Sequence, residues 1–306
     1  MTRPYVHTRA NDPHGLIWYE TRPRHLAGPG DPRRITQTLR AAGWTNLSTP
    51  DYPHVVLASP DQQLTLVLEP QPGRYGSWWR LRSQQGRWTA EFGANTPVEM
   101  IAALTDALLE PEPAASAPEI WPMLTTAGWC YERGEHANES ATHPDGRLRL
   151  RRWSVEPLVD RFYWTAEAAR EVEHAGPFGP IWRAWLDDDM PRHLLAAFVN
   201  ALVCDEPVQR SRGDVPHNYL VTQEERGPQS DQLAADHTAR LKAVRAATRR
   251  ARRAAARATR PASPPTAEAP AAPAPGRPPL TYERTVRSFP PTRTLTARHW
   301  PSSACT

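Results

Sequence analysis

The sequence predicts an α+β fold with two tandem α-β-β-β-β-α units, each an antiparallel sheet with helices on one face. Two observations support this prediction. Residues 39–44 (LRAAGW) return as residues 124–129 (LTTAGW), and residues 100–108 return as 194–202 with the same helical spacing of apolar side chains. Repetition of a whole set of elements within one chain indicates duplicated folding units. A C-terminal basic helix and a disordered tail complete the prediction.

Each unit opens with a helix that stops at a glycine. Asp31 stands where an N-cap is needed, and the proline after it lacks only an N–H that has no helical partner. Gly43 and Gly128 mark the other ends, because glycine accepts the left-handed conformation that terminates helices. We expect Trp44 and Trp129, next in the chain, to pack over the last turn as core; stacking on a ligand is the alternative.

Four strands follow the first helix of each unit. In the first unit they are residues 54–58, 64–69, 78–82 and 88–92. Apolar and polar side chains alternate there, which gives each strand one buried and one wetter face. Residues 59–61 (SPD) and 143–145 (HPD) are matching hairpin turns.

A second helix closes each unit. In the first unit, Thr96 and Glu99 are predicted to form a capping box, with Pro97 at the first helical position. The second unit is nine residues longer between its third and fourth strands, and residues 166–174 there have a helical bias.

The adjacent tryptophans Trp78 and Trp79 point to opposite faces of their strand, so only one of them can join the core. The other, with Arg80 and Arg82 nearby, could stack single-stranded nucleic acid. It could equally be buried between the units, a placement that the acidic body favours. Two like units could also pair with pseudo-twofold symmetry and bury their outer tryptophans against each other.

Charge is segregated along the chain. Residues 240–260 hold nine basic side chains and no acid, whereas residues 1–239 carry a net charge of −8. Arginines four residues apart on this helix repel each other, and an anionic partner would relieve the repulsion. We therefore expect the basic side chains to bind nucleic acid. They are Arg240, Lys242, Arg245, Arg249, Arg250, Arg252, Arg253, Arg257 and Arg260.

These patterns divide the chain into six predicted segments. They are a flexible N-terminus (1–15), a first repeat domain with its entry segment (16–111), a second repeat domain (118–207), a connector (208–229), the basic helix (230–260) and a Pro/Ala-rich disordered tail (261–306). The three cysteines have no metal-binding spacing, and no apolar run approaches the ~18 residues of a membrane span. A cytoplasmic protein without membrane contact is expected.

Few residues have a pattern that suggests chemistry. Arg24 and His25 precede a Gly-Pro-Gly loop and could bind an anion; the alternative is an ordered entry loop packed on the first sheet. Residues 187–189 (DDD) could bind a divalent metal, but a helix dipole independently favours acids at that position. The sequence has no nucleophile–base signature, Walker loop or GxGxxG. We predict no catalytic residues, no metal and no cofactor, and the expectation for an enzyme leans towards no.

Several segments together form a recognisable family pattern: residues 23–32 (PRHLAGPGDP), 39–44, 77–80 (SWWR), 88–93 (WTAEFG) and the closing helices. On these residues the body of the chain resembles the actinobacterial domain of unknown function 317 family. The resemblance covers about residues 20–210, in two copies as that family commonly has, and it implies no known activity, cofactor or catalytic residue. The second copy lacks an equivalent of the PRHL entry, so any role of that loop belongs to the first copy.

The combined prediction is a non-catalytic binding or scaffold protein with tandem repeat domains, associated with nucleic acid through its basic C-terminal helix. One alternative is a purely protein–protein interaction module. A less favoured one is an enzyme with a site between the two repeats.

Overall fold

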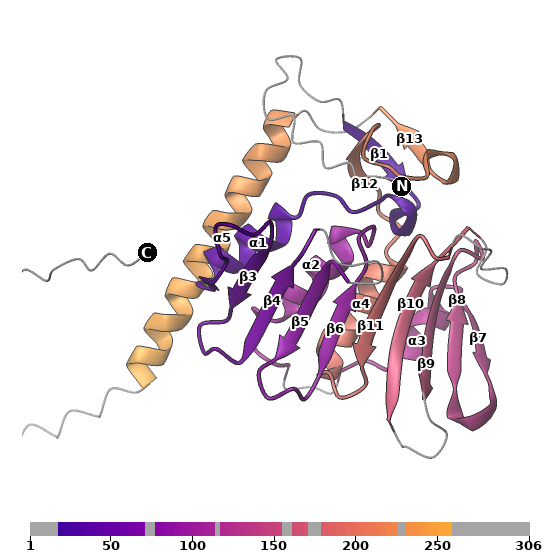
Figure 1. Cartoon of the computed structure of the whole chain (residues 1–306), viewed down its shortest axis with the longest axis horizontal. Helices are drawn as coiled ribbons and strands as arrows, with labels where there is room; N and C mark the ends of the chain where they lie inside the picture. Colours follow the sequence, from indigo (N-terminus) through magenta and orange to yellow (C-terminus); the bar gives the residue numbers. More distant parts are fainter. Residues whose placement is uncertain are drawn as a thin grey trace, which may run out of the picture. The chain divides into compact units, whose positions relative to one another are not determined.

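The computed structural model describes residues 18–70, 77–113, 117–154, 161–170, 179–225 and 230–258. Two antiparallel sheets and five α-helices make up this part of the chain (Figure 1). The predicted flexible N-terminus (1–15) and disordered tail (261–306) lie outside the described residues.

Both repeats have the predicted order of elements, with one short strand more than expected. The first consists of α1 (Arg33–Ala41), β2 (Thr45–Asn46), β3 (Val55–Ala58), β4 (Leu64–Leu68), β5 (Trp79–Ser83), β6 (Thr89–Phe92) and α2 (Val98–Ala107). The second consists of α3 (Ile120–Thr126), β7 (Cys130–Arg133), β8 (Glu139–Thr142), β9 (Leu148–Ser154), β10 (Phe162–Ala168), β11 (Trp182–Asp187) and α4 (Arg192–Val203). The additional strands are β2 and β7. The helical bias was wrong for residues 166–168, which extend β10, and residues 171–178 lie outside the described part.

The two repeats join into one ten-stranded sheet. Its strand order is β2-β3-β4-β5-β6-β11-β10-β9-β8-β7, so the last strand of each repeat pairs with its counterpart at the centre. Ala90 lies opposite Leu186 and Phe92 opposite Ala184, and these pairs are equivalent in the two repeats. The register therefore has a local twofold axis. The predicted pseudo-twofold pairing is confirmed, but it forms edge to edge rather than through outer tryptophans.

The closing helices meet over this seam. Figure 1 shows α2, α3 and α4 behind the sheet, and α2 packs against α4 along the line where β6 meets β11. The Phe92 ring of the first repeat lies 5.8 Å from the Phe198 ring of the second, and both side chains are fully buried. The two repeats thus share one hydrophobic core.

In both copies, the repeated LxxxGW segment contains the end of a helix, followed by a tryptophan that belongs to the core. Trp44 N–H donates to the Leu39 carbonyl (3.0 Å) and Gly43 N–H to that of Arg40 (3.0 Å), and the second repeat has the same two bonds. This pair of bonds with a left-handed glycine is a Schellman motif. Trp44 is 6% exposed and Trp129 is 4% exposed, so the prediction that both indoles pack as core is confirmed.

A smaller sheet joins the two ends of the repeat region. β1 (Trp18–Arg22) lies between β12 (Val208–Ser211) and β13 (Thr222–Glu224), and η3 (Asn218–Leu220) precedes the latter. The segment predicted as a connector therefore contains two strands. From β12, the buried guanidinium of Arg210 donates to the carbonyls of Ala27 (3.2 Å) and Gly28 (3.2 Å) and binds Glu99 (2.7 Å).

The predicted capping box on α2 is wrong. No side chain caps this helix, and in the described residues the Thr96 hydroxyl has no hydrogen-bond partner. The Glu99 carboxylate turns to Arg210 instead, because a buried guanidinium requires a charged acceptor more strongly than a backbone N–H does. Burial alone would raise the pKa of Glu99, but the charge and hydrogen bonds of Arg210 outweigh it and lower the pKa.

The basic helix α5 (Ser230–Ala258) packs along α1. His237 Nε2 lies 2.7 Å from Gln37 Oε1, and Ser230 Oγ accepts a hydrogen bond from the Trp18 indole (3.0 Å). Val244 packs against the common core. Figure 1 shows α5 alongside the first repeat, next to α1 and β3.

We expect Arg210→Gln to lower the free energy of unfolding by about 3 kcal/mol, because it leaves Glu99 without its charged partner. The matched variant is Arg82→Gln, which removes a pair with Glu91 from a side chain that is 57% exposed and should cost less than about 1 kcal/mol. Urea titrations of both variants measure the difference. Since the pKa of Glu99 is lowered by folding, its contribution is present above the unfolded pKa of about 4.3 and is lost as the pH falls below it. The loss of unfolding free energy in Arg210→Gln should therefore become smaller in acid. An equal loss in the two variants at neutral pH would contradict this account.

Candidate functional site at the junction of the repeats

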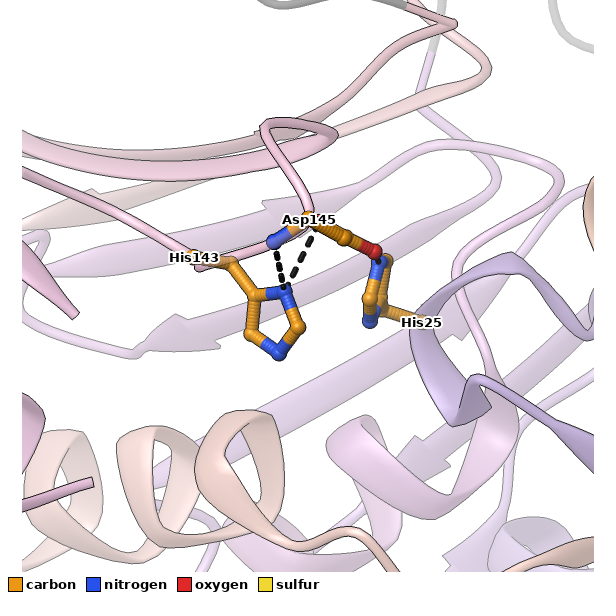
Figure 2. A group of neighbouring side chains, drawn as sticks. All are labelled: His25, His143 and Asp145. Carbon is orange, nitrogen blue, oxygen red and sulfur yellow. Dashed lines mark hydrogen bonds and ion pairs between the residues drawn. The ribbon is translucent and has the colours of Figure 1, made fainter. Parts of the chain in front are cut away.

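Two histidines and an aspartate from different parts of the chain lie close together. His25 belongs to η1 (Arg24–Leu26) in the entry segment of the first repeat, and His143 and Asp145 belong to the turn between β8 and β9 (Figure 2). The Trp182 indole donates to the His25 carbonyl (2.7 Å) and holds this segment in place. The entry segment of one repeat thus reaches the hairpin turn of the other.

The carboxylate of Asp145 lies between the two imidazoles. Its Oδ2 is 2.9 Å from His25 Nε2, and its Oδ1 is 2.7 Å from His143 Nδ1. The ring centroids of His25 and His143 are 4.8 Å apart, and the Trp129 and His143 rings pack at right angles with their centroids 5.4 Å apart. Asp145 Oδ1 also accepts from the backbone N–H of Arg147 (2.9 Å), which fixes its orientation.

Burial sets the charge state of this cluster. The His25 side chain is 4% exposed, and desolvation lowers its pKa despite the opposing effect of Asp145. The charges of His143 and Arg147 lower the pKa of His25 further. Burial would raise the pKa of Asp145, but the nearby imidazoles and the Arg147 N–H outweigh it, so the pKa is lowered. A neutral imidazole beside a carboxylate is therefore the favoured state at neutral pH.

The equivalent turn of the first repeat lacks the imidazoles. Ser59 occupies the position of His143, and its hydroxyl donates to Asp61 Oδ1 (2.5 Å). Asp61 Oδ1 also accepts a hydrogen bond from the backbone N–H two residues later, that of Gln63 (3.1 Å). Asp145 Oδ1 accepts the equivalent bond from Arg147. The turn is thus common to both repeats, and its histidine occurs in the second repeat only.

Sequence reasoning predicted Arg24 and His25 as an anion site and missed the partners of His25. The structure places Arg24 against Glu206, whose carbonyl oxygen accepts from its Nε at 3.1 Å. The carbonyls of the adjoining loop face Arg210. Anion binding by Arg24 and His25 stays a prediction. The replacement of SPD by HPD was the available signal for His143, but only the fold brings His25 beside it.

The acidic run 187–189 turns its first two carboxylates to different partners. Asp188 accepts from the Trp164 indole (2.6 Å) and binds Arg152 (2.8 Å), which lowers its pKa against the effect of burial. Asp187 accepts from the backbone N–H of Thr89 across the seam (2.7 Å). These two aspartates therefore serve as structural acceptors.

A pocket of about 410 Å³ lies within the second repeat. It is lined by Trp121 and Trp164, whose rings are 5.1 Å apart, and by Glu139 and Arg152. Glu139 and Arg152 are cross-strand neighbours, and the first repeat has an apolar valine–leucine pair at the same place. The first repeat therefore lacks the polar pair that lines this pocket.

The outer face of the sheet is charged but internally paired. Arg80 binds Glu69 and Arg82 binds Glu91, while Trp78 is partly buried against the core. These contacts favour the prediction of burial over a stacking platform for single-stranded nucleic acid.

The predicted nucleic-acid-binding residues, apart from Arg260, lie on α5; Arg260 is outside the described residues. From Arg249 to the end of the helix every residue is exposed. None of the described helices combines the length and hydrophobicity needed to span a bilayer.

Two joined copies of one α+β unit, with a divergent junction, define the class of protein. A family model described as SPDY, domain of unknown function 317, matches residues 58–114 and 142–208. One match falls on each repeat, which is consistent with two tandem copies of that domain. No curated protein and no solved structure matches it.

We expect Asp145→Asn to destabilise the metal-free protein by about 1–3 kcal/mol, because it leaves the buried His25 without a charged neighbour. Asp61→Asn is the matched control, since it alters the same turn where no histidine is in contact, and it should cost about 1 kcal/mol less. Thermal unfolding in the presence of a chelator measures both. Equal costs would show that the His25 contact adds nothing to stability.

Proposed function

We propose that the protein is a non-catalytic binding or scaffold protein that associates with nucleic acid through α5. The observation that carries the proposal is a set of exposed basic side chains that form no ion pair within the described part of the chain. They are Lys242, Arg245, Arg249, Arg250, Arg252, Arg253 and Arg257. Phosphate groups would supply the missing negative charge.

The body has already used most of its basic side chains internally. Ion pairs join Arg34 to Asp106, Arg80 to Glu69, and Arg152 to Asp188. The folded repeats are also acidic overall, so a polyanion would be repelled by them and attracted to α5. Nucleic acid is therefore the partner whose charge suits this helix and does not suit the rest of the molecule.

The packing of α5 leaves its basic side chains outward. Its contacts with α1 use His237 and the partly buried Val244, on a narrow stripe. Arg240 is the basic residue nearest this contact, and burial together with the charge of Arg34 lowers its pKa. The arginines beyond Val244 are exposed, although the Arg252 guanidinium lies beside Gly43 of the body. The helix is thus held by one side and can present the other to a partner.

The proposal places the protein in the cytoplasm, where nucleic acid is present and thiols stay reduced. Cys130 and Cys204 are free cysteines, which suits a reducing compartment.

Changing Arg245, Arg249, Arg253 and Arg257 together to Gln should abolish most nucleic-acid affinity while keeping the helix, because Gln has a similar helix propensity. Binding of the full-length chain to a labelled DNA duplex and to an RNA of equal length is measured by fluorescence anisotropy over a range of salt concentrations. The slope of log K against log salt should fall in magnitude by about 3.6 on the duplex if all four arginines contact phosphates, since each lost contact removes about 0.9 from it.

A matched control removes the same charge from the body. The residues changed to Gln are Arg22, Arg87, Arg133 and Arg212, which are all exposed. This variant should keep the affinity and the salt slope within about twofold. If both variants bind nucleic acid as the original chain does, or if neither the original chain nor any variant binds it, the nucleic-acid role of α5 is rejected. A protein partner is then the favoured hypothesis.

A further inference from the structure

The His25–His143–Asp145 cluster has more acceptor atoms than protons to share between them. The Asp145 N–H donates to His143 Nδ1 (3.2 Å), so this nitrogen presents a lone pair. The same lone pair lies 2.7 Å from Asp145 Oδ1, another acceptor. Two acceptors at this distance repel unless a proton or a metal ion lies between them.

The second contact in the cluster also lacks an aligned hydrogen bond. His25 Nε2 and Asp145 Oδ2 are 2.9 Å apart but are not aligned for a hydrogen bond, and within the described residues neither atom has another hydrogen-bond partner. His25 is almost completely buried, so water does not readily satisfy it. Buried polar atoms without partners are costly in a folded protein and require an explanation.

The ligand atoms converge closely enough to share one ion. One donor atom from each of the three residues lies within 4.8 Å of the other two. Two neutral imidazoles and one carboxylate suit Zn²⁺ and related first-row ions, which are bound by three protein ligands and a water in open sites. We propose that His25, His143 and Asp145 bind a divalent transition-metal ion, with Zn²⁺ as the preferred occupant.

The surroundings orient the ligands as a metal centre requires. Trp182 holds the His25 backbone, Trp129 packs on the His143 ring, and the Arg147 N–H fixes the carboxylate. Such supports around the ligands usually tune a metal site. The Arg147 charge opposes a cation, but its buried Nε has no hydrogen-bond partner in the described residues and suits a water or anion on the ion.

The ion would fasten two segments that are far apart in the sequence. His25 comes from the entry of the first repeat, whereas the other two ligands come from a turn of the second (Figure 2). Because the His143 and Asp145 side chains are 17% and 22% exposed, an ion can reach the cluster from their side. This assignment is independent of α5 and does not rest on nucleic-acid binding.

Zn²⁺ binding to the full-length, chelator-treated protein is measured by competition with a chromophoric chelator. One ion per chain is expected, and His25→Gln and His143→Gln should each weaken binding by more than about 100-fold, because each removes a ligand rather than a neighbour of one. The control variants His54→Gln and His193→Gln change histidines outside the cluster and should leave the affinity unchanged. Unaltered binding by His25→Gln would overturn the proposal.

A second measurement keeps the test informative if a variant fails to fold. The X-ray absorption spectrum of Zn²⁺ bound to the unmodified chain should show nitrogen and oxygen ligands with imidazole scattering. Sulfur ligands would assign the ion to cysteines, and absence of stoichiometric binding would show that the cluster is only a structural contact. Either result rejects the metal site. Thermal unfolding should also show a midpoint that rises with Zn²⁺ and falls again with chelator.

Discussion

The pairing of β6 with β11 is the contact on which the rest of the molecule depends. Each repeat by itself would end in an edge strand, whose unpaired N–H and C=O groups can pair with a strand of another chain. Because these strands are equivalent in a duplicated unit, one symmetric register satisfies both edges at once. The same register brings α2 and α4 together and lets Phe92 and Phe198 close a single core. The hairpin turns and entry segment are then held in fixed positions.

Because the two repeats build a symmetric sheet, positions where their residues differ are not explained by the fold they share. The entry segment occurs once, and Arg210 fastens its loop while η1 reaches towards the second repeat. The second repeat differs from the first at two places: Glu139 and Arg152 replace an apolar pair in the pocket, and His143 replaces a serine at the turn. None of these replacements is needed to build the sheet, since the first repeat forms it without them. They mark the second repeat as the divergent copy.

Local elements could be predicted from the sequence because their causes are local. The glycine after each first helix and the alternation in the strands fix backbone and burial within a few residues, as Trp44 shows. Contacts between distant segments could not be predicted. Glu99 matched a capping box but met Arg210, which is 111 residues away. His25 likewise had no sequence signal for Asp145. The strands β2 and β7 were not predicted. β2 has only two residues and β7 has four of mixed polarity, so neither shows a recognisable alternation of apolar and polar side chains.

The basic helix poses a question that folding alone does not answer. A helix can be held to the body by a narrow stripe: His237 of α5 bonds to Gln37 of α1, and Val244 packs against the common core. Its outward positions could be neutral without loss of that contact. Arginines at i and i+4, such as Arg249 and Arg253, cost about 0.2–0.5 kcal/mol per pair. A charge pattern that weakens the isolated helix, and that no acid of the described body offsets, is explained most simply by a polyanion outside the chain.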